Sequence, residues 1–180
     1  LWTKACFQGD VKLEWEYTRL DTITRFVNIV YLQAAGTGQA PYDHDIAAWS
    51  HLRDIPLMRT YFTRMRLLHI SYAAFGNEDD KDEDYVRARY YPVRSGEDFD
   101  TSTAIAPDYQ QTGLFRPGIT YHFTIIKTRE HLLFEVRHAE ERTLFHWDIR
   151  HLALINNGRI GIPHMWTRCS RYKDVRIFTM

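Results

Sequence analysis

The chain has 180 residues, 44% of them hydrophobic and 14% aromatic, which is enough to bury one core within the usual size of one domain. Its 23 basic and 23 acidic side chains balance to a formal charge of zero, which argues against strongly basic nucleic-acid or membrane-surface binders. No apolar run approaches the roughly 18 residues of a membrane-spanning helix. We therefore expect one domain over residues 1–180 that binds neither nucleic acid nor a membrane, and its oligomeric state stays open.

Alternation of apolar and polar residues, which is typical of half-buried strands, recurs along most of the sequence. In residues 11–17 it places Val11, Leu13, Trp15 and Tyr17 on one inward face. The other predicted strands are residues 26–33, 67–74, 85–91, 121–127, 131–138, 143–148, 158–162 and 172–178. Short strands separated by turns that contain glycine or proline predict an all-β fold, either a sandwich or a barrel.

One stretch between two predicted strands has a different character. Residues 45–53 and 57–65 contain good helix formers on either side of Pro56, so we expect a short helical or irregular excursion around residues 45–65.

The two ends of the chain carry two further expectations. Leu1 leads directly into predicted sheet, so we expect the natural protein to begin earlier. If a leader is missing, a secreted or periplasmic location is favoured, and a cytoplasmic one stays open. Cys6 and Cys169 are too few for a disulfide framework and lack metal-ligand spacing, while one bridge between the chain ends stays open.

A family resemblance rests on several segments that occur in the same order over most of the chain, from about Phe7 to Phe178. The segments are residues 31–36 (Tyr-Leu-Gln-Ala-Ala-Gly), 68–72 (Leu-His-Ile-Ser-Tyr) and 158–161 (Gly-Arg-Ile-Gly), followed by Met165 and residues 172–174 (Tyr-Lys-Asp). In these the chain resembles the YesU-like bacterial proteins, a family of unknown function. The resemblance implies a concanavalin A-like or galectin-like jelly-roll β-sandwich of two antiparallel sheets. It also implies a setting among genes that degrade acidic plant or algal polysaccharides, and it implies no established reaction.

Strand phase groups the candidate site residues. His69 and Ser71 share one face of their strand, and Arg87, Arg89 and Tyr91 share one face of the next. If both faces line the groove of a curved sheet, the groove is basic and aromatic. A shift of one residue in register would turn all five residues away from it.

Further basic and aromatic residues are expected to bind the same ligand. Arginine presents a planar fork that matches a carboxylate or sulfate, so we expect an acidic oligosaccharide or polysaccharide as the partner. The alternative is that these arginines pair with the equally numerous acids on the surface. Besides Ser71 and Arg87, the predicted substrate-binding residues are Arg59, Tyr61, His164, Trp166 and Arg168.

Acidic polysaccharides are cut by elimination or by hydrolysis, and the two reactions need different residues. Elimination needs a cation for the uronate and groups that take and return protons, for which His69, Arg89 and Tyr91 are the candidate catalytic residues. A retaining hydrolase needs two close carboxyl groups, and Glu14 and Glu16 have the spacing but occupy what is predicted to be an ordinary outer face. We expect a polysaccharide lyase, with a non-catalytic lectin-like module, a sandwich-type hydrolase and a structural accessory domain as alternatives.

No cofactor is expected. The acidic run over residues 77–84 has Asp-x-Asp spacing that suits calcium, but it lacks the glycine and the distal glutamate of a calcium loop, so a solvated hairpin loop is favoured. The nine histidines show no paired spacing with a third ligand, so no zinc site is predicted.

Overall fold

Among the residues that the computed structural model describes, 1–76 and 84–180, eleven strands form two antiparallel sheets. The strands are β1 (Phe7–Gln8), β2 (Val11–Arg19), β3 (Asn28–Gly36), β4 (Met65–Ala74), β5 (Tyr85–Tyr91), β6 (Ala104–Gln110), β7 (Thr120–Lys127), β8 (His131–His138), β9 (Glu141–Asp148), β10 (Asn157–Gly161) and β11 (Ser170–Thr179). The helical elements are the 3-10 turn η1 (Ser50–Arg53) and the helices α1 (Met58–Arg64) and α2 (Phe99–Thr103).

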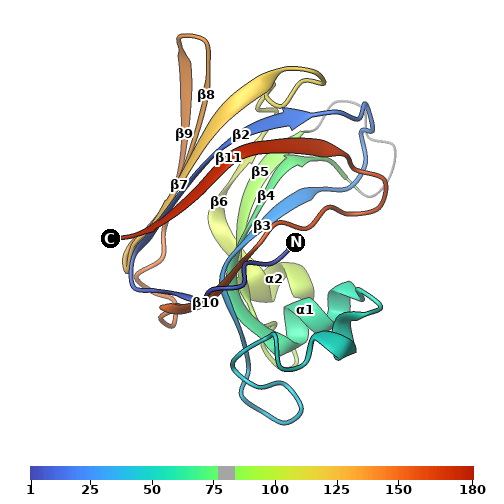
Figure 1. The fold of residues 1–180 in the computed structure, drawn as a ribbon, viewed down its shortest axis with the longest axis vertical. Coiled ribbons are helices and arrows are strands. Elements are labelled where there is room, and N and C mark those ends of the chain that lie inside the picture. Colours follow the sequence, from blue (N-terminus) through green and yellow to red (C-terminus); the bar gives the residue numbers. More distant parts are fainter. Residues whose placement is uncertain (77–83) are drawn as a thin grey trace.

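The two sheets are stacked as a sandwich. The six-stranded sheet has the order β1-β10-β3-β4-β5-β6, and the five-stranded sheet has the order β11-β2-β7-β8-β9. Figure 1 shows the two layers one over the other, with α1 and α2 at the side of the six-stranded sheet that faces away from the five-stranded sheet. The predicted all-β sandwich of two antiparallel sheets is thereby confirmed.

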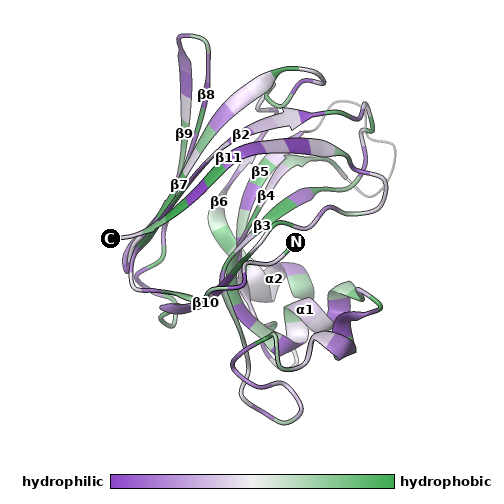
Figure 2. Cartoon of the chain, in the orientation of Figure 1, coloured by the Kyte–Doolittle hydropathy of each residue, from purple (hydrophilic) through white to green (hydrophobic). Residues whose placement is uncertain are grey.

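The core between the sheets follows the predicted alternation. Val11, Leu13, Trp15 and Tyr17 of β2 are buried, and the Tyr17 ring stacks on Phe123 of β7 with centroids 4.9 Å apart. Figure 2 shows hydrophilic and hydrophobic residues interspersed along individual strands, β11 among them, because these strands have one face in the core and one face in solvent.

A second apolar layer covers part of the outer face of the six-stranded sheet. Tyr31 of β3 and Leu67 of β4 are buried there, together with Trp49 and Tyr61 from the connection between those two strands. The expected excursion around residues 45–65 is therefore present as η1 and α1. Because β3 and β4 are covered on both faces at this end, their residues are almost continuously buried.

The connection between β3 and β4 begins in close contact with the sheet. Gly36 donates its N–H to the carbonyl of His44 at 2.9 Å. A Cβ atom at Gly36 would overlap the carbonyl oxygen of Asp43, so the chain can turn here only with glycine.

The sequence pattern does not predict two of the strands. β1 spans two residues, too few for a periodic pattern, and β6 contains Pro107 and is mostly exposed. Proline cannot donate a ladder hydrogen bond and is tolerated on edge strands, and β6 is indeed the last strand of its sheet.

Candidate functional site

A cleft of about 460 Å³ lies on the outer face of the six-stranded sheet, where the apolar layer ends. Side chains of β4 and β5 form its floor. Its walls come from α1, from α2 and from the segments beside β3 and before β11. One end of this sheet face is thus covered by the apolar layer, and the other end is open at the cleft.

Opposed residues of two strands form the floor of the cleft. The pairing of β4 with β5 sets His69 opposite Arg89 and Ser71 opposite Arg87, and Tyr91 lies two residues beyond Arg89. All five side chains line the cleft. The predicted strand phase is therefore correct, and the roles of these residues in binding or catalysis stay predictions.

A hydrogen-bonded chain runs through this floor. His69 Nδ1 is 2.9 Å from the hydroxyl oxygen of Tyr91, and His69 Nε2 is 2.7 Å from Ser71 Oγ. Burial, with the charges of Arg89 and Arg87, lowers the pKa of His69 to about 3, so the ring is neutral near pH 7.

The direction of the protons in this chain follows from burial. Tyr91 is fully buried, and among the described residues its hydroxyl has His69 as its hydrogen-bond partner, so we assign Tyr91 as donor to Nδ1. The Nε2–H of His69 then donates to Ser71 Oγ. Ser71 is left with its own O–H as a donor toward the cleft.

Both guanidinium groups of the floor already have counter-ions. Arg89 donates to Asp100 at 2.6 Å and to the Thr103 hydroxyl at 2.7 Å. Arg87 donates through Nε to Asp108 at 2.6 Å. The acids come from α2 and β6, so the edge of the sheet supplies the negative charge that balances the floor.

The walls of the cleft are largely apolar. Met58 and Phe62 lie one turn apart on α1 and line the cleft, and Phe62 packs on Phe99 of α2 with ring centroids 4.9 Å apart. The Phe99 ring also lies under the guanidinium of Arg89, 4.4 Å from its centroid. A ligand with both hydroxyl groups and C–H faces would find partners for each.

An exposed aromatic platform adjoins the cleft. Trp166 is 77% exposed and stacks on Phe26, with ring centroids 5.4 Å apart and an interplanar angle of 16°. Its φ of 51° is uncommon for a residue other than glycine. The chain neighbours Met165 and Val27 both line the cleft, so this predicted binding residue lies at its margin.

Three other predicted binding residues lie away from the cleft. Arg59 is an exposed residue of α1 but does not line it. Tyr61 is buried in the apolar layer, where its ring stacks on that of Trp2. His164 is 2.8 Å from the Tyr172 hydroxyl and faces an apolar recess. The structure therefore does not bring these three residues together with His69 in one cleft, and their role in ligand binding stays a prediction.

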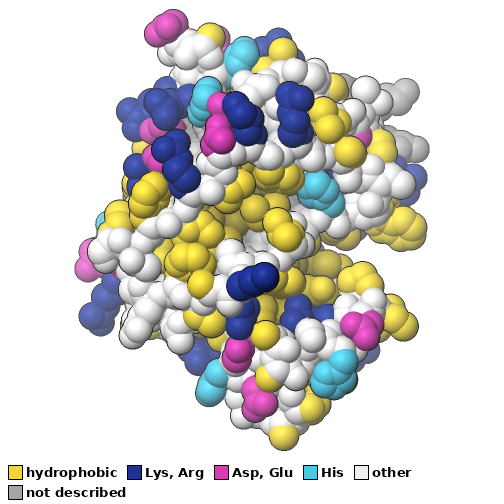
Figure 3. All heavy atoms as spheres, in the orientation of Figure 1, with side chains coloured by type: hydrophobic (Ala, Val, Ile, Leu, Met, Phe, Trp, Pro, Cys, Tyr) yellow, Lys and Arg dark blue, Asp and Glu magenta, His cyan; other side chains and the backbone are white. Residues whose placement is uncertain are grey.

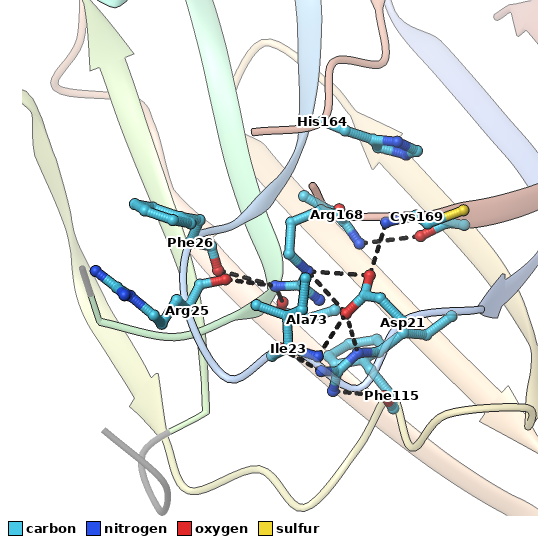
Figure 4. Close-up of polar contacts among 12 residues, drawn as sticks. Asp21, Ile23, Arg25, Phe26, Ala73, Phe115, His164, Arg168 and Cys169 are labelled. Atoms are coloured by element: carbon cyan, nitrogen blue, oxygen red, sulfur yellow. Dashed lines mark hydrogen bonds and ion pairs between the residues drawn. The ribbon is translucent and has the colours of Figure 1, made fainter. Parts of the chain in front are cut away.

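Arg168 has a structural role. Its side chain is 0% exposed; it pairs with Asp21 at 3.1 Å and donates to the carbonyls of Phe26 and Ala73 at 2.9 and 2.7 Å (Figure 4). Burial alone would raise the pKa of Asp21, but the N–H of Cys169 and the charge of Arg168 outweigh it, so the pKa is lowered. The prediction that Arg168 binds substrate is corrected, since a ligand in the cleft cannot reach it.

The acids of the cleft are the residues that sequence reasoning missed. Asp100 follows a recognisable helix start, in which the carboxylate of Asp98 accepts the N–H of Thr101 at 2.9 Å. That signal predicts a helix but not its contact with Arg89. Asp108 lies in β6, which the alternation of apolar and polar residues does not predict.

Glu14 and Glu16 occupy the outer face of β2, as predicted. Glu14 pairs with Lys12 at 2.7 Å and Glu16 with Lys173 at 3.5 Å. Both acids thus belong to ion pairs on the face of the five-stranded sheet that is opposite the core.

The remaining features concern the cysteines, potential metal ligands and membrane-spanning helices. Cys6 and Cys169 are free, exposed thiols. In residues 1–76 and 84–180 there is no group of three or more potential metal ligands, and no helix there is long and apolar enough to cross a membrane. The acidic run over residues 77–84, for which the sequence favours a solvated loop over a calcium site, falls almost wholly on residues 77–83, outside the described residues.

A second recess, of about 620 Å³, opens at the edge of the sandwich. Leu13 and Trp15 of β2, Ile160 of β10 and Val175 and Ile177 of β11 line it. Figure 3 shows hydrophobic side chains in the hollow at the middle of this face. It lacks the balanced polar groups of the cleft.

Comparison with known proteins shows the class of fold. No family model matches the chain, and no curated protein matches it, so the YesU-like resemblance stays a prediction. Among solved structures, the chain is similar to a *Bacillus subtilis* protein of unknown function with a galectin-like fold (TM-score 0.65, 14% identity, covering 98% of this chain and 74% of that one).

Two further solved structures share the architecture. The exoplasmic/lumenal domain of VIP36 in its Ca²⁺/Man2-bound form has a TM-score of 0.58 at 11% identity, covering 99% of this chain and 70% of that one. The carbohydrate-binding module CBM66 from Bacillus subtilis has a TM-score of 0.51 at 10% identity, covering 98% and 78%. The fold is therefore a galectin-like β-sandwich.

Proposed function

We propose that the protein is a lectin-like module that binds a saccharide in the cleft. The observation that carries this proposal is the composition of the cleft, where donors from Ser71 and Arg87 and an acceptor from Asp100 lie beside the rings of Phe62 and Phe99. Sugars present hydroxyl groups and C–H faces together, and such a mixture matches both. VIP36, crystallised with Man2, and the module CBM66 support the proposal as fold neighbours.

Binding without turnover fits the state of the floor better than catalysis does. A general base needs a pKa near the working pH and must reach the proton it takes. The pKa of His69 is lowered to about 3, and both its ring nitrogens are engaged. Burial also raises the pKa of Tyr91 well above its usual value.

The binding proposal is tested by screening the purified protein on an array of neutral and acidic glycans, followed by calorimetry with the best ligand. Phe99→Ala should weaken binding about fivefold or more, because it removes an apolar wall. The matched control is Leu144→Ala, which removes an exposed apolar side chain from the outer face of the five-stranded sheet and should leave affinity unchanged. Repeating the titration with Ca²⁺ and with EDTA tests the expectation that binding needs no cofactor. No binding to any saccharide would refute the proposal.

A polysaccharide lyase is the second candidate, and one observation favours it: His69, Arg89 and Tyr91, the predicted catalytic residues, meet in one cleft. Elimination at a uronic acid would release unsaturated products that absorb in the ultraviolet. Pectic, alginate-like, glucuronan and ulvan polymers are the substrates to screen, with His69→Ala as the inactive variant. Absence of this absorbance on all four polymers would refute the lyase and leave the lectin-like module.

A further inference from the structure

We propose that the cleft selects uncharged, hydroxyl-rich sugars over uronic acids, because Asp100 and Asp108 already hold the cations that a sugar carboxylate would need. This inference rests on the proposed saccharide binding and specifies its ligand class. It departs from the acidic ligand that the arginines of the sequence predict.

At Arg89, the group that a ligand meets is the partner carboxylate of Asp100. The Arg89 side chain is only 7% exposed, whereas the Asp100 side chain is 76% exposed. Two of the guanidinium nitrogens are bonded to Asp100 and Thr103, and the ring of Phe99 lies against the guanidinium group. A ligand at this end of the cleft therefore meets a carboxylate, which accepts hydrogen bonds from hydroxyl groups and repels another carboxylate.

At Arg87, the guanidinium group is only partly used by its counter-ion Asp108. Its Nε is used by Asp108, and the ring of Tyr85 lies 4.6 Å from its guanidinium carbon. Among the described residues, the two terminal nitrogens of Arg87 have no hydrogen-bond partner, so they can donate to a ligand. These donors serve a hydroxyl oxygen well, while the adjacent Asp108 cancels the charge that would attract an anion.

The charges of the described residues at the floor of the cleft balance one another. Among the described residues that line the cleft or bond directly to its floor, two guanidinium groups face two carboxylates, and His69 is neutral. The net charge at the floor is therefore zero. A uronate would bring an unbalanced negative charge into partly buried space, where such charges are costly.

Hydroxyl groups suit this arrangement because each one both donates and accepts. Ser71 offers its O–H, Arg87 offers N–H groups and Asp100 offers oxygens. A carboxylate only accepts hydrogen bonds, so it cannot donate to the Asp100 oxygens as a hydroxyl group can.

The test uses pairs of ligands that differ only at carbon 6. Calorimetry would compare galacto-oligosaccharides with oligogalacturonides, manno-oligosaccharides with mannuronate oligomers, and gluco-oligosaccharides with glucuronate oligomers, each pair matched in linkage, anomeric configuration and chain length. In whichever series binds, we expect the neutral member to bind about tenfold or more tightly than its uronate. Neutral-sugar affinity should also change little with salt, because an uncharged ligand has no charge for salt to screen.

Two variants locate the cause of the preference. Asp100→Asn and Asp108→Asn should each reduce the neutral-to-uronate affinity ratio at least threefold, and the double variant should reduce it further. Asp148→Asn is the matched control, because it removes an acid of β9 that pairs with Arg150 away from the cleft, and it should leave the ratio unchanged. Asp100 is exposed, so its asparagine variant is expected to fold.

The outcomes separate the two proposals. Tighter binding of uronates by the wild-type protein would overturn the selectivity while leaving saccharide binding intact. An unchanged ratio in both single variants would overturn the assigned cause. Failure of every series, and of every glycan on the array, to bind would refute the proposed function itself, and the selectivity with it.

Discussion

Arginine and aspartate meet in two regions of this molecule with opposite results. In the cluster around Asp21, the buried carboxylate pairs with Arg168 (Figure 4) and also with Arg19. In the cleft, Arg89 is buried and its partner Asp100 is exposed. The first arrangement is closed to ligands, whereas the second presents a carboxylate to them. An arginine therefore indicates an anion site only after its counter-ion has been located.

The closed cluster joins parts of the chain that lie far apart in sequence. Asp21 follows β2, Ala73 lies in β4 and Arg168 precedes β11, so the contacts connect the two sheets. The cleft pairs instead connect neighbouring elements at one edge of one sheet. We therefore expect the cluster to matter for stability and the cleft pairs for selectivity.

The largest expected effect is on stability. Arg168→Met should lower the free energy of unfolding by about 3–5 kcal/mol, because it leaves Asp21 buried without one of its two cations. Arg87→Met, at a partly exposed cleft pair, should lower it by about 1 kcal/mol or less. Urea denaturation measures both. Equal losses in the two variants would remove the distinction between the two regions.

The two regions should also respond to acid in different pH windows. The folded pKa of His69, about 3, lies below its ordinary value of 6.5, so in this interval the unfolded chain binds a proton that the folded chain does not. The free energy of unfolding should then fall by about 2–3 kcal/mol between about pH 6.5 and about pH 4.5. Asp21 has a lowered pKa, so its contribution is present above the ordinary aspartate pKa and is lost as the pH falls through the folded value.

Urea titrations at several pH values separate these windows. His69→Gln should flatten the dependence above about pH 4.5, and Asp21→Asn should change it only at lower pH. If His69→Gln kept the wild-type slope, the buried neutral histidine would not be its source.

A smaller effect is expected at the margin of the cleft. Trp166→Ala should weaken binding of long oligosaccharides about three- to tenfold and leave that of monosaccharides nearly unchanged, because the platform lies beside the cleft and not in its floor. Calorimetry with a chain-length series measures this. The exposed Leu154 supplies the control variant Leu154→Ala. An equal loss of affinity at every chain length would instead show that Trp166 contacts the sugar unit bound at the floor of the cleft.

The smallest effect concerns two buried tyrosines. The Tyr31 hydroxyl has no hydrogen-bond partner among the described residues, whereas that of Tyr72 lies 2.8 Å from the hydroxyl of Tyr172. Tyr31→Phe should leave the free energy of unfolding unchanged or raise it by up to about 1 kcal/mol, and Tyr72→Phe should lower it by about 1 kcal/mol. Thermal unfolding of both variants gives the sign. A loss for Tyr31→Phe would reveal a partner for its hydroxyl.

Sequence reasoning predicted what depends on neighbours along one strand. The two-residue period placed His69 with Ser71 and Arg87 with Arg89. The pairing of β4 with β5 then set these two pairs opposite each other. Sequence reasoning could not predict that Arg168 forms an ion pair with Asp21, 147 residues away, or that Asp100 is the counter-ion of Arg89. Ion pairs between distant segments depend on the assembled fold, and equal numbers of acids and bases do not say which ones meet.

The close contact at Gly36 has a consequence for how such a protein can diverge. There the chain leaves β3, forms the segment that carries Met58 and Phe62, and returns as β4, whose residue Met65 pairs with Gly36 itself. One wall of the cleft is therefore a single contiguous insert between two adjacent, mutually bonded strands. An exchanged insert would reshape this wall of the cleft and would have to supply its own cover for Tyr31 and Leu67, which Trp49 and Tyr61 now bury, so residues 37–64 are the natural unit for grafting.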